Sequence, residues 1–421
     1  MTFDIESLQP EKPPLEDKGR LISAISSLKI RDFRLYLFSI LFGFNGAQMV
    51  MVARGWLVYT MTDSPLALGM VGAALGLPLV LLSLLGGALA DQVRKRNLLI
   101  ATQAMFTSLN LIIVLLIQTE LIAIWHLIAA AFAGGVTLAF NIPARQAFLM
   151  DLVGKKDLTN AIALNSVTMN VCRIASPALA GVLIKLLDIP GVYWIIVCSN
   201  LISLCFLVAI PGRGKIKLQS QVPLIRNIKD GLLYVRTNRI IFTLLVIAFV
   251  PILVAMPYQM LLPVFAKSVF HAGETGLGLL MSSVGVGALL GSSAVAILSN
   301  YRQKGLLMLG AGSVFGVFLV LFANASSLWI ASICLLFVGS GSAMFMILTN
   351  SLIMENTPEA YVGRVMSLFV MTFGLMPLAV LPAGGLAEFV GAPLVVSGGG
   401  VILFLVIGGV YLGRSDIRQL K

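Results

Sequence analysis

Long apolar runs separated by short polar stretches fill the chain from about residue 35 onward. Because the hydrocarbon core of a bilayer is about 30 Å thick, an α-helix needs roughly 20 apolar residues to cross it. On that criterion the sequence predicts an all-α membrane protein with twelve transmembrane helices. The predicted spans are 35–59, 66–91, 98–118, 123–150, 159–187, 191–210, 240–267, 276–299, 305–323, 327–354, 363–388 and 392–412.

The longest polar interruption divides the twelve runs into two sets of six. Within it, Leu224, Ile228, Leu232 and Val235 recur at helical spacing, which predicts an amphipathic helix lying on the membrane surface. The expected regions are a cytoplasmic N-terminal tail (1–34), a first six-helix half (35–210), a cytoplasmic linker (211–239), a second six-helix half (240–412) and a cytoplasmic C-terminal tail (413–421).

A weak internal repeat relates the two sets of helices. Residues 132–152 and 337–357 each contain a glycine cluster, then an aromatic residue and then a polar face, and each leads into a basic hairpin. Two equivalent segments at corresponding places indicate that the halves are pseudo-symmetric.

The distribution of charged residues predicts the orientation of the chain in the membrane. The chain is 58% hydrophobic and only 11% charged, against roughly 25% in soluble domains, so lipid must be its main solvent. With the N-terminus inside, 24 of the 29 Lys and Arg fall on the cytoplasmic side. The positive-inside rule therefore predicts that both termini are cytoplasmic, and the expected location is a bacterial inner (plasma) membrane. The net charge of +11 then reflects topology and contact with anionic lipid, and no nucleic-acid partner is expected.

The hairpin after the second predicted helix carries a recognisable motif. Residues 87–96, GALADQVRKR, resemble the signature G-x-x-x-D-(R/K)-x-G-(R/K)-(R/K) of the major facilitator superfamily. Gln92 stands where a base is usual and Arg94 where a glycine is usual. The resemblance covers nearly the whole chain beyond the tail. Four stretches are similar to the branch that holds enterobactin-type siderophore exporters and macrolide-efflux proteins: 54–78, 140–148, 256–280 and 356–369.

This resemblance implies a gate between two access states. Asp91 is expected to pair with the basic hairpin, and Asp151 is a candidate second anion of the same cluster; an ordinary interfacial charge cluster is the alternative. Residues 176–181, SPALAG, resemble the Gly-Pro-rich motif of the superfamily's antiporters, although a kink without functional consequence is also open. The candidate gating residues are Gly87, Asp91, Arg94, Lys95, Arg96, Asp151, Pro177 and Gly181.

Three arginines lie inside predicted spans, whereas none of the 18 carboxylates sits near the centre of one. Placing an arginine at mid-bilayer costs about 2.5–3.5 kcal/mol on insertion scales, so Arg54, Arg145 and Arg173 are candidate functional residues. They favour an anionic or carbonyl-rich substrate, and the lack of a buried acid weakens proton coupling. Alternatively, Arg54 snorkels to the outer interface and Arg145 pairs with Asp151 or Asp91. Arg173 is the best cavity candidate.

Uncharged polar residues at cavity depth complete the substrate-binding prediction, although each could equally bond a neighbouring helix. They are Asn45, Gln48, Asn141, Asn170, Tyr258, Gln259 and Asn350.

The function expected from the pattern and the resemblance is secondary active export. The substrate would be a small amphipathic molecule, siderophore-like or drug-like, moved out of the cytoplasm by alternating access, with protons as the coupling ion left open. A lipid or lysophospholipid flippase of the same fold is the alternative, since a cavity with arginines could hold a phosphate head group. No nucleophile–base pair, His cluster or phosphate loop predicts an enzyme, a cofactor or a metal site. We expect a monomer.

Overall fold

The computed structural model describes residues 26–211, 234–298 and 301–420, and the regular structure within them is helical. Most of the N-terminal tail and most of the predicted amphipathic helix of the linker lie outside these residues. The elements are η1 (Ser26–Lys29), α2 (Arg31–Thr62), α3 (Pro65–Gln92), α4 (Lys95–Gln118), α5 (Ile124–Ala209), α7 (Arg239–Val250), η2 (Pro251–Ala255), α8 (Tyr258–Val264), η3 (Phe265–Val269), α9 (Gly273–Ile297), α10 (Lys304–Ala323), α11 (Leu328–Glu355), α12 (Glu359–Val390), α13 (Ala392–Gly413) and α14 (Ser415–Arg418).

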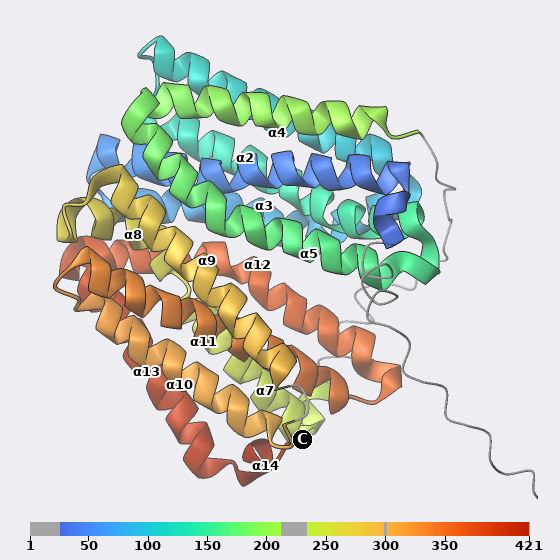
Figure 1. The fold of residues 1–421 in the computed structure, drawn as a ribbon. Coiled ribbons are helices and arrows are strands. Elements are labelled where there is room, and N and C mark those ends of the chain that lie inside the picture. The colour runs from blue at the N-terminus through green and yellow to red at the C-terminus, as the bar shows by residue number, and fades with distance from the viewer. Residues whose placement is uncertain (1–25, 212–233, 299–300, 421) are drawn as a thin grey trace, which may run out of the picture.

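The helices form two bundles that follow the order of the chain. Figure 1 shows α2 to α5 in a first bundle and α7 to α14 in a second. The bundles lie against each other at one end and diverge toward the other (Figure 1). We call these the closed end, which carries Asp63, Lys267 and Glu388, and the open end, which carries Asp151 and Glu355.

The 86-residue element α5 consists of three helices, because its backbone is non-helical at two single residues. Gly154 has φ 68° and ψ −180°, a conformation that glycine adopts without steric cost, and Asp188 has φ 56° and ψ 177°. Loops were expected near both positions, but a one-residue bend is enough to redirect the chain. The predicted helices 123–150, 159–187 and 191–210 therefore correspond to three helices of α5 that are joined by the turns at these two residues.

Ten stretches of the described residues are long and apolar enough to cross a membrane. One of them, Asp157–Ala209, has 53 residues, which at 1.5 Å per residue is about 80 Å and exceeds twice the bilayer core. The chain is an all-helical, multi-pass membrane protein.

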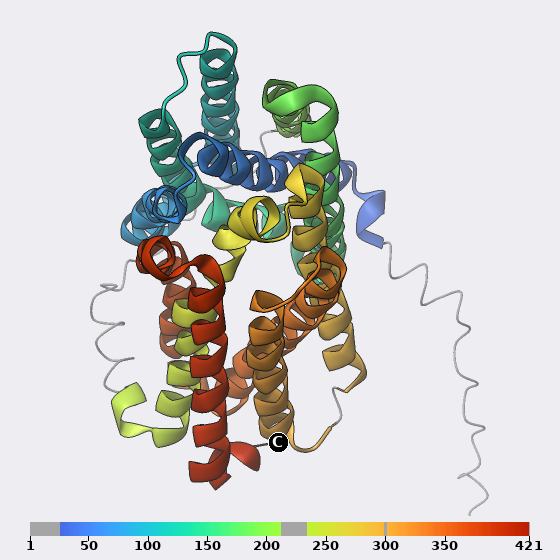
Figure 2. The ribbon, with the colours of Figure 1, turned by 90° about the vertical axis from the view of Figure 1, so that its left-hand side faces the viewer.

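The predicted helix 240–267 is interrupted rather than regular. Pro251 begins the π-helix η2, and Pro263 lies just before the second π-helix η3. Proline has no backbone N–H and clashes with the preceding turn, so the hydrogen-bond ladder shifts at these places. The short helix α8 results between them, and Figure 2 shows it in yellow between the two bundles at the closed end.

Polar side chains join the bundles at the closed end. The ammonium group of Lys267 pairs with the carboxylate of Asp63, and the hydroxyls of Tyr59 and Ser268 lie 2.7 Å apart. Glu388 on α12 reaches the start of α3, where its carboxylate accepts hydrogen bonds from the Ser64 hydroxyl at 2.8 Å and from the Leu66 N–H at 3.2 Å. An anion at a helix N-terminus satisfies free N–H groups and the helix dipole.

Small residues let the two bundles touch through their backbones. A Cβ added to Gly384 on α12 would lie 2.6 Å from the Pro65 carbonyl of α3. On α5, a Cβ at Gly181 would lie 2.5 Å from the Glu274 carbonyl of α9. Such distances are too short for any side chain, so both crossings depend on glycine.

Two ion pairs between described residues at the open end each lie within one bundle. Lys95 pairs with Asp151 at 2.7 Å in the first bundle, and Lys304 pairs with Glu355 at 2.6 Å in the second. Beyond α13, Arg414 hydrogen-bonds Asp416 and thereby lowers the pKa of that carboxyl. These pairs do not tie α5 to α10 or α11, which is consistent with the separation of the bundles here.

Candidate substrate cavity

A cavity of about 710 Å³ lies in the first bundle. Its walls come from residues 36–47 of α2, 102–106 of α4 and two straight segments of α5, 137–150 and 158–169. Binding sites for small molecules usually have volumes of 300–1,000 Å³. The cavity is therefore large enough for a drug-sized molecule.

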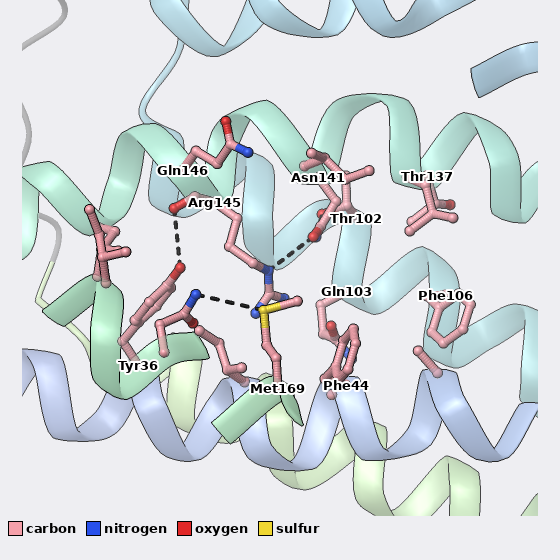
Figure 3. Close-up of a pocket in the computed structure, with 18 of the residues that line it drawn as sticks. Tyr36, Phe44, Thr102, Gln103, Phe106, Thr137, Asn141, Arg145, Gln146 and Met169 are labelled. Atoms are coloured by element: carbon pink, nitrogen blue, oxygen red, sulfur yellow. Dashed lines mark hydrogen bonds between the residues drawn. The ribbon is translucent and has the colours of Figure 1, made fainter. Parts of the chain in front are cut away.

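Among the described lining residues, Arg145 is the cationic one, and it is held by a chain of hydrogen bonds (Figure 3). Its Nε donates to Asn141 Oδ1 at 3.1 Å, because residues four apart share one helix face. Asn141 Nδ2 donates in turn to Thr102 Oγ1 at 2.8 Å. The Tyr36 hydroxyl donates to the Arg145 carbonyl at 3.1 Å, so α2, α4 and α5 all fix this position.

Among the described residues, this arrangement leaves the terminal N–H groups of Arg145 available to a ligand. A guanidinium has five donors, of which the Nε–H is used by Asn141. The remaining fork suits a carboxylate or phosphate, which it can bind through two parallel hydrogen bonds. In the close-up the Arg145 side chain extends from its helix toward Met169 (Figure 3).

Aromatic and aliphatic side chains surround the arginine. Phe44 and Phe106 line one part of the cavity, and Met169 lies below Arg145 (Figure 3). Gln103 faces the same space but also donates to Asn200 Oδ1 at 3.0 Å, which fixes its amide. The cavity therefore offers one charge, a few oriented amides and a large apolar wall, the composition expected for an amphipathic ligand.

Two of the predicted substrate-binding residues, Asn141 and Arg145, line this cavity, and others lie elsewhere in the first bundle. Asn45 accepts a hydrogen bond from the Ser176 hydroxyl at 2.6 Å and contacts Ser199 at 3.5 Å, so it joins helices. Gln48 and Asn170 are partly buried and lie outside the cavity lining.

The other two embedded arginines occupy different places. Arg54 lines a small pocket together with Asn110 and Tyr193, and this pocket is nearer to the closed end than the main cavity is. Arg173 has an exposed side chain and lies where α5 crosses α9, since a Cβ at Gly285 would be 3.0 Å from its carbonyl. Neither belongs to the lining of the 710 Å³ cavity.

Three predicted residues lie in the second bundle. Tyr258 is buried on α8, Gln259 follows it, and Asn350 is partly buried on α11. Within the described residues the amide oxygen of Asn350 has no hydrogen-bond partner. These residues stand apart from the cavity in the first bundle.

The motif residues fall into two groups. In the hairpin, Lys95 pairs with Asp151 and Arg96 donates to the Val208 carbonyl at 2.6 Å, while Arg94 precedes α4. The surroundings of Gly87 and the side chain of Asp91 lie outside the described part of the structure.

The second group lies at the crossing of α5 and α9. A Cβ at Gly278 of α9 would lie 2.7 Å from the Pro177 carbonyl of α5, and Gly181 of α5 also packs against α9. The predicted Gly-Pro-rich motif is thus an inter-bundle contact.

Sequence reasoning missed several cavity residues. Thr102 and Gln103 are polar positions inside the predicted span 98–118 and could have been noticed on that ground. Tyr36, Phe44 and Met169 gave no such signal, because aromatic residues and methionine are common in membrane helices. Within the described residues, no group of three or more His, Cys, Asp or Glu could hold a metal ion.

The family profile of transmembrane secretion effectors matches residues 22–420 of this sequence. The chain belongs to that family. It is a secondary transporter of the major facilitator type and not an enzyme.

Known relatives of the transporter share about a quarter of its sequence. The staphyloferrin A transporter of Staphylococcus aureus is 28% identical over 347 residues, which are 80% of this chain and 85% of the relative. Macrolide efflux protein A of Streptococcus pyogenes is 23% identical over 78% of this chain and 83% of its own. The enterobactin exporter of Citrobacter koseri is 25% identical over 86% of this chain and 87% of its own. The resemblance inferred from the sequence is confirmed.

Solved structures support the same fold for the transporter. The nucleoside transporter NupG superimposes with a TM-score of 0.73 at 13% identity, over 91% of this chain and 98% of its own. A bacterial homologue of the iron transporter ferroportin, in an inward-facing state, has a TM-score of 0.71 at 16% identity, over 90% of this chain and 98% of its own.

Proposed function

We propose that this transporter exports a small amphipathic anion, siderophore-like or drug-like, from the cytoplasm. The observation that carries the proposal is the Arg145 guanidinium, oriented by Asn141 and facing an apolar cavity of about 710 Å³. Burying an unpaired arginine in a membrane protein costs free energy, and a carboxylate or phosphate ligand would offset that cost. The names of the relatives, which include two siderophore transporters and a macrolide efflux protein, support export.

The topology proposed for this function has twelve crossings in two pseudo-symmetric halves. The bend at Asp188 divides the 53-residue stretch Asp157–Ala209 into two crossings, and α12 adds one more to the ten stretches. The distribution of basic residues supports a cytoplasmic location for both termini, and hence for the open end. The described conformation would then receive substrate from the cytoplasm.

Alternating access would reverse the contacts between the bundles. The pairs at the closed end, Lys267 with Asp63 and Glu388 with Ser64, would separate to release substrate outside. The hairpin base Lys95 and its partner Asp151 would belong to the opposite gate.

Comparison of culture medium from deletion and complemented cells tests the export proposal. We expect an amphipathic anion to be depleted from the medium of the deletion strain and to accumulate inside those cells. The same cells treated with an uncoupler address proton coupling, because efflux that persists without a proton gradient would exclude it. Identical metabolite profiles in the two strains under all conditions would refute export.

A flippase for a lysophospholipid is the second candidate. Ile142, Met150 and Ile162 line the cavity and are also exposed, so an acyl chain could leave the cavity sideways while Arg145 holds the phosphate. Reconstituted protein that moves a fluorescent lysophospholipid between leaflets, and leaves the secreted anion unmoved, would favour this candidate over export.

A further inference from the structure

A second concave surface, of about 380 Å³, lies between α10 and α11 in the second bundle. The two backbones approach closely there, since a Cβ on Gly341 would lie 2.8 Å from the Ala311 carbonyl. Leu306, Val314 and Met344 border the surface. Large side chains therefore flank a trough whose floor has small residues, and we call this trough the α10–α11 groove.

Gly310 leaves the floor of the groove empty. A Cβ added at this position meets no described atom within 4 Å, whereas Gly312 on the same helix packs against Phe345. At this depth the surrounding solvent is lipid, and an empty trough would deprive its walls of dispersion contacts. An acyl chain is the apolar group at hand to fill it.

The dimensions of the groove match one leaflet. On α10 its lining runs from Leu306 to Val314, which at 1.5 Å per residue is about 12 Å, and Tyr301 lies before the start of the helix. Half of a bilayer core is roughly 15 Å, so the acyl chain of a lipid in one leaflet is long enough to fill this length.

Positive charge lies at the end of the groove where a head group would sit. Tyr301 lines the groove there, and both Tyr301 and Arg302 are exposed. Lys304 follows them and pairs with Glu355, while Arg418 lies nearby on α14, which packs on Gly305. Tyrosine and arginine at the membrane interface suit the phosphate of an anionic lipid.

We propose that the α10–α11 groove binds one acyl chain of an anionic phospholipid, whose phosphate lies at Tyr301 and Arg302. The lipid fills the space above Gly310 and stabilises the packing of α10 on α11. The site is separate from the cavity around Arg145, so the proposal holds whether or not the exported molecule is an anion.

Thermal unfolding of the detergent-purified full chain, titrated with phosphatidylglycerol or phosphatidylcholine of the same acyl chains, tests the site. Because a ligand of the folded state raises the unfolding temperature, phosphatidylglycerol should raise it more than phosphatidylcholine does. Gly310→Phe fills the groove and should abolish that rise. Arg302→Gln should weaken the apparent affinity for phosphatidylglycerol about fivefold, which corresponds to about 1 kcal/mol per basic residue.

Gly409→Phe on α13 is the matched control, because a Cβ there also meets no atom within 4 Å and the residue is exposed outside the groove. It should keep the full response to phosphatidylglycerol. A rise that is undiminished in Gly310→Phe overturns the groove as the site. Equal responses to the two lipids in the unaltered protein overturn the preference for an anionic head group.

Discussion

Asn141 decides the direction of the Arg145 side chain. Its amide has a donor and an acceptor end, and Thr102 takes the donor, which leaves the oxygen for the arginine. The tyrosine hydroxyl of Tyr36 holds the backbone of the same turn. An arginine fixed in this way loses little freedom when it binds an anion, so more of the interaction energy remains for affinity.

Replacing this arginine should weaken substrate binding more than it weakens insertion. Arg145→Gln removes a charge-assisted hydrogen bond worth about 1.5–3 kcal/mol, so we expect KM to rise roughly 10- to 100-fold. Arg145→Lys keeps the charge but lacks the planar fork, and should be intermediate. Initial rates of uptake of the secreted anion into inside-out vesicles measure both.

Arg173→Gln is the control for this prediction, since Arg173 lies outside the cavity lining. Its KM should stay within twofold of the unaltered protein. If Arg173→Gln impairs binding and Arg145→Gln does not, the site lies at the α5–α9 crossing instead.

At the residue scale, the sequence could predict which charged and polar residues are embedded in the membrane, but not which of them face the cavity. An embedded arginine and an asparagine four residues before it are visible in the sequence, and both line the cavity. Asn45 and Arg173 have the same kinds of side chain at similar depth, yet one joins helices and the other is exposed beside α9. Which face of a helix meets the cavity depends on its rotation against neighbours, and an apolar membrane helix carries little amphipathic signal to fix that rotation.

At the scale of the elements, the crossing of α3 and α12 is a close backbone contact between the bundles near the closed end. Gly69 and Gly384 lie opposite each other, and the Glu388 carboxylate accepts hydrogen bonds from the start of α3 one turn later. Close backbone approach of this kind has no tolerance for a side chain, because each helix fills the space that a methyl group would need.

A side chain at Gly384 should therefore keep the closed end apart. Gly384→Val would place a Cβ 2.6 Å from the Pro65 carbonyl, and we expect transport to fall at least tenfold while the protein still inserts. A cysteine introduced at Ser64 should also react faster with a membrane-impermeant maleimide. Gly385→Val is the neighbouring control, since its Cβ would make an ordinary 3.8 Å contact with Leu66. Equal transport by the two variants would contradict a role for this crossing.

Most of the helices could be predicted from hydropathy, whereas the turns and the irregular segments that connect them could not. The starts and ends of α9, α10 and α13 fall within three residues of the predicted spans, because length and apolarity alone decide them. The turn at Asp188 and the π-helices of 251–269 depend on backbone torsions and on proline, which hydropathy does not describe.

At the scale of the whole molecule, the two bundles should move as bodies. Bridging one bundle to the other ought to stop transport, whereas bridging two helices of one bundle ought not. In a variant with its four cysteines replaced, Asp63→Cys with Lys267→Cys places the pair across the closed end, and Lys304→Cys with Glu355→Cys places it within the second bundle.

A short bis-maleimide should abolish transport by the first pair and spare the second. Vesicle uptake before and after treatment measures the effect, with unreacted samples of each variant as references. Continued transport by a fully cross-linked Asp63–Lys267 pair would mean that the closed end does not open.

Among the residues that the structure describes, the cavity walls all belong to the first bundle, and this has a consequence for the energy that drives the cycle. A ligand shifts a conformational equilibrium only by the difference between its affinities for the two states. A molecule held solely by Arg145 and its neighbours would bind both states alike and would leave their populations unchanged. The second bundle must therefore supply contacts that differ between the two states when it closes over the occupied cavity. Whether a bound molecule is transported or only bound then depends on the second bundle.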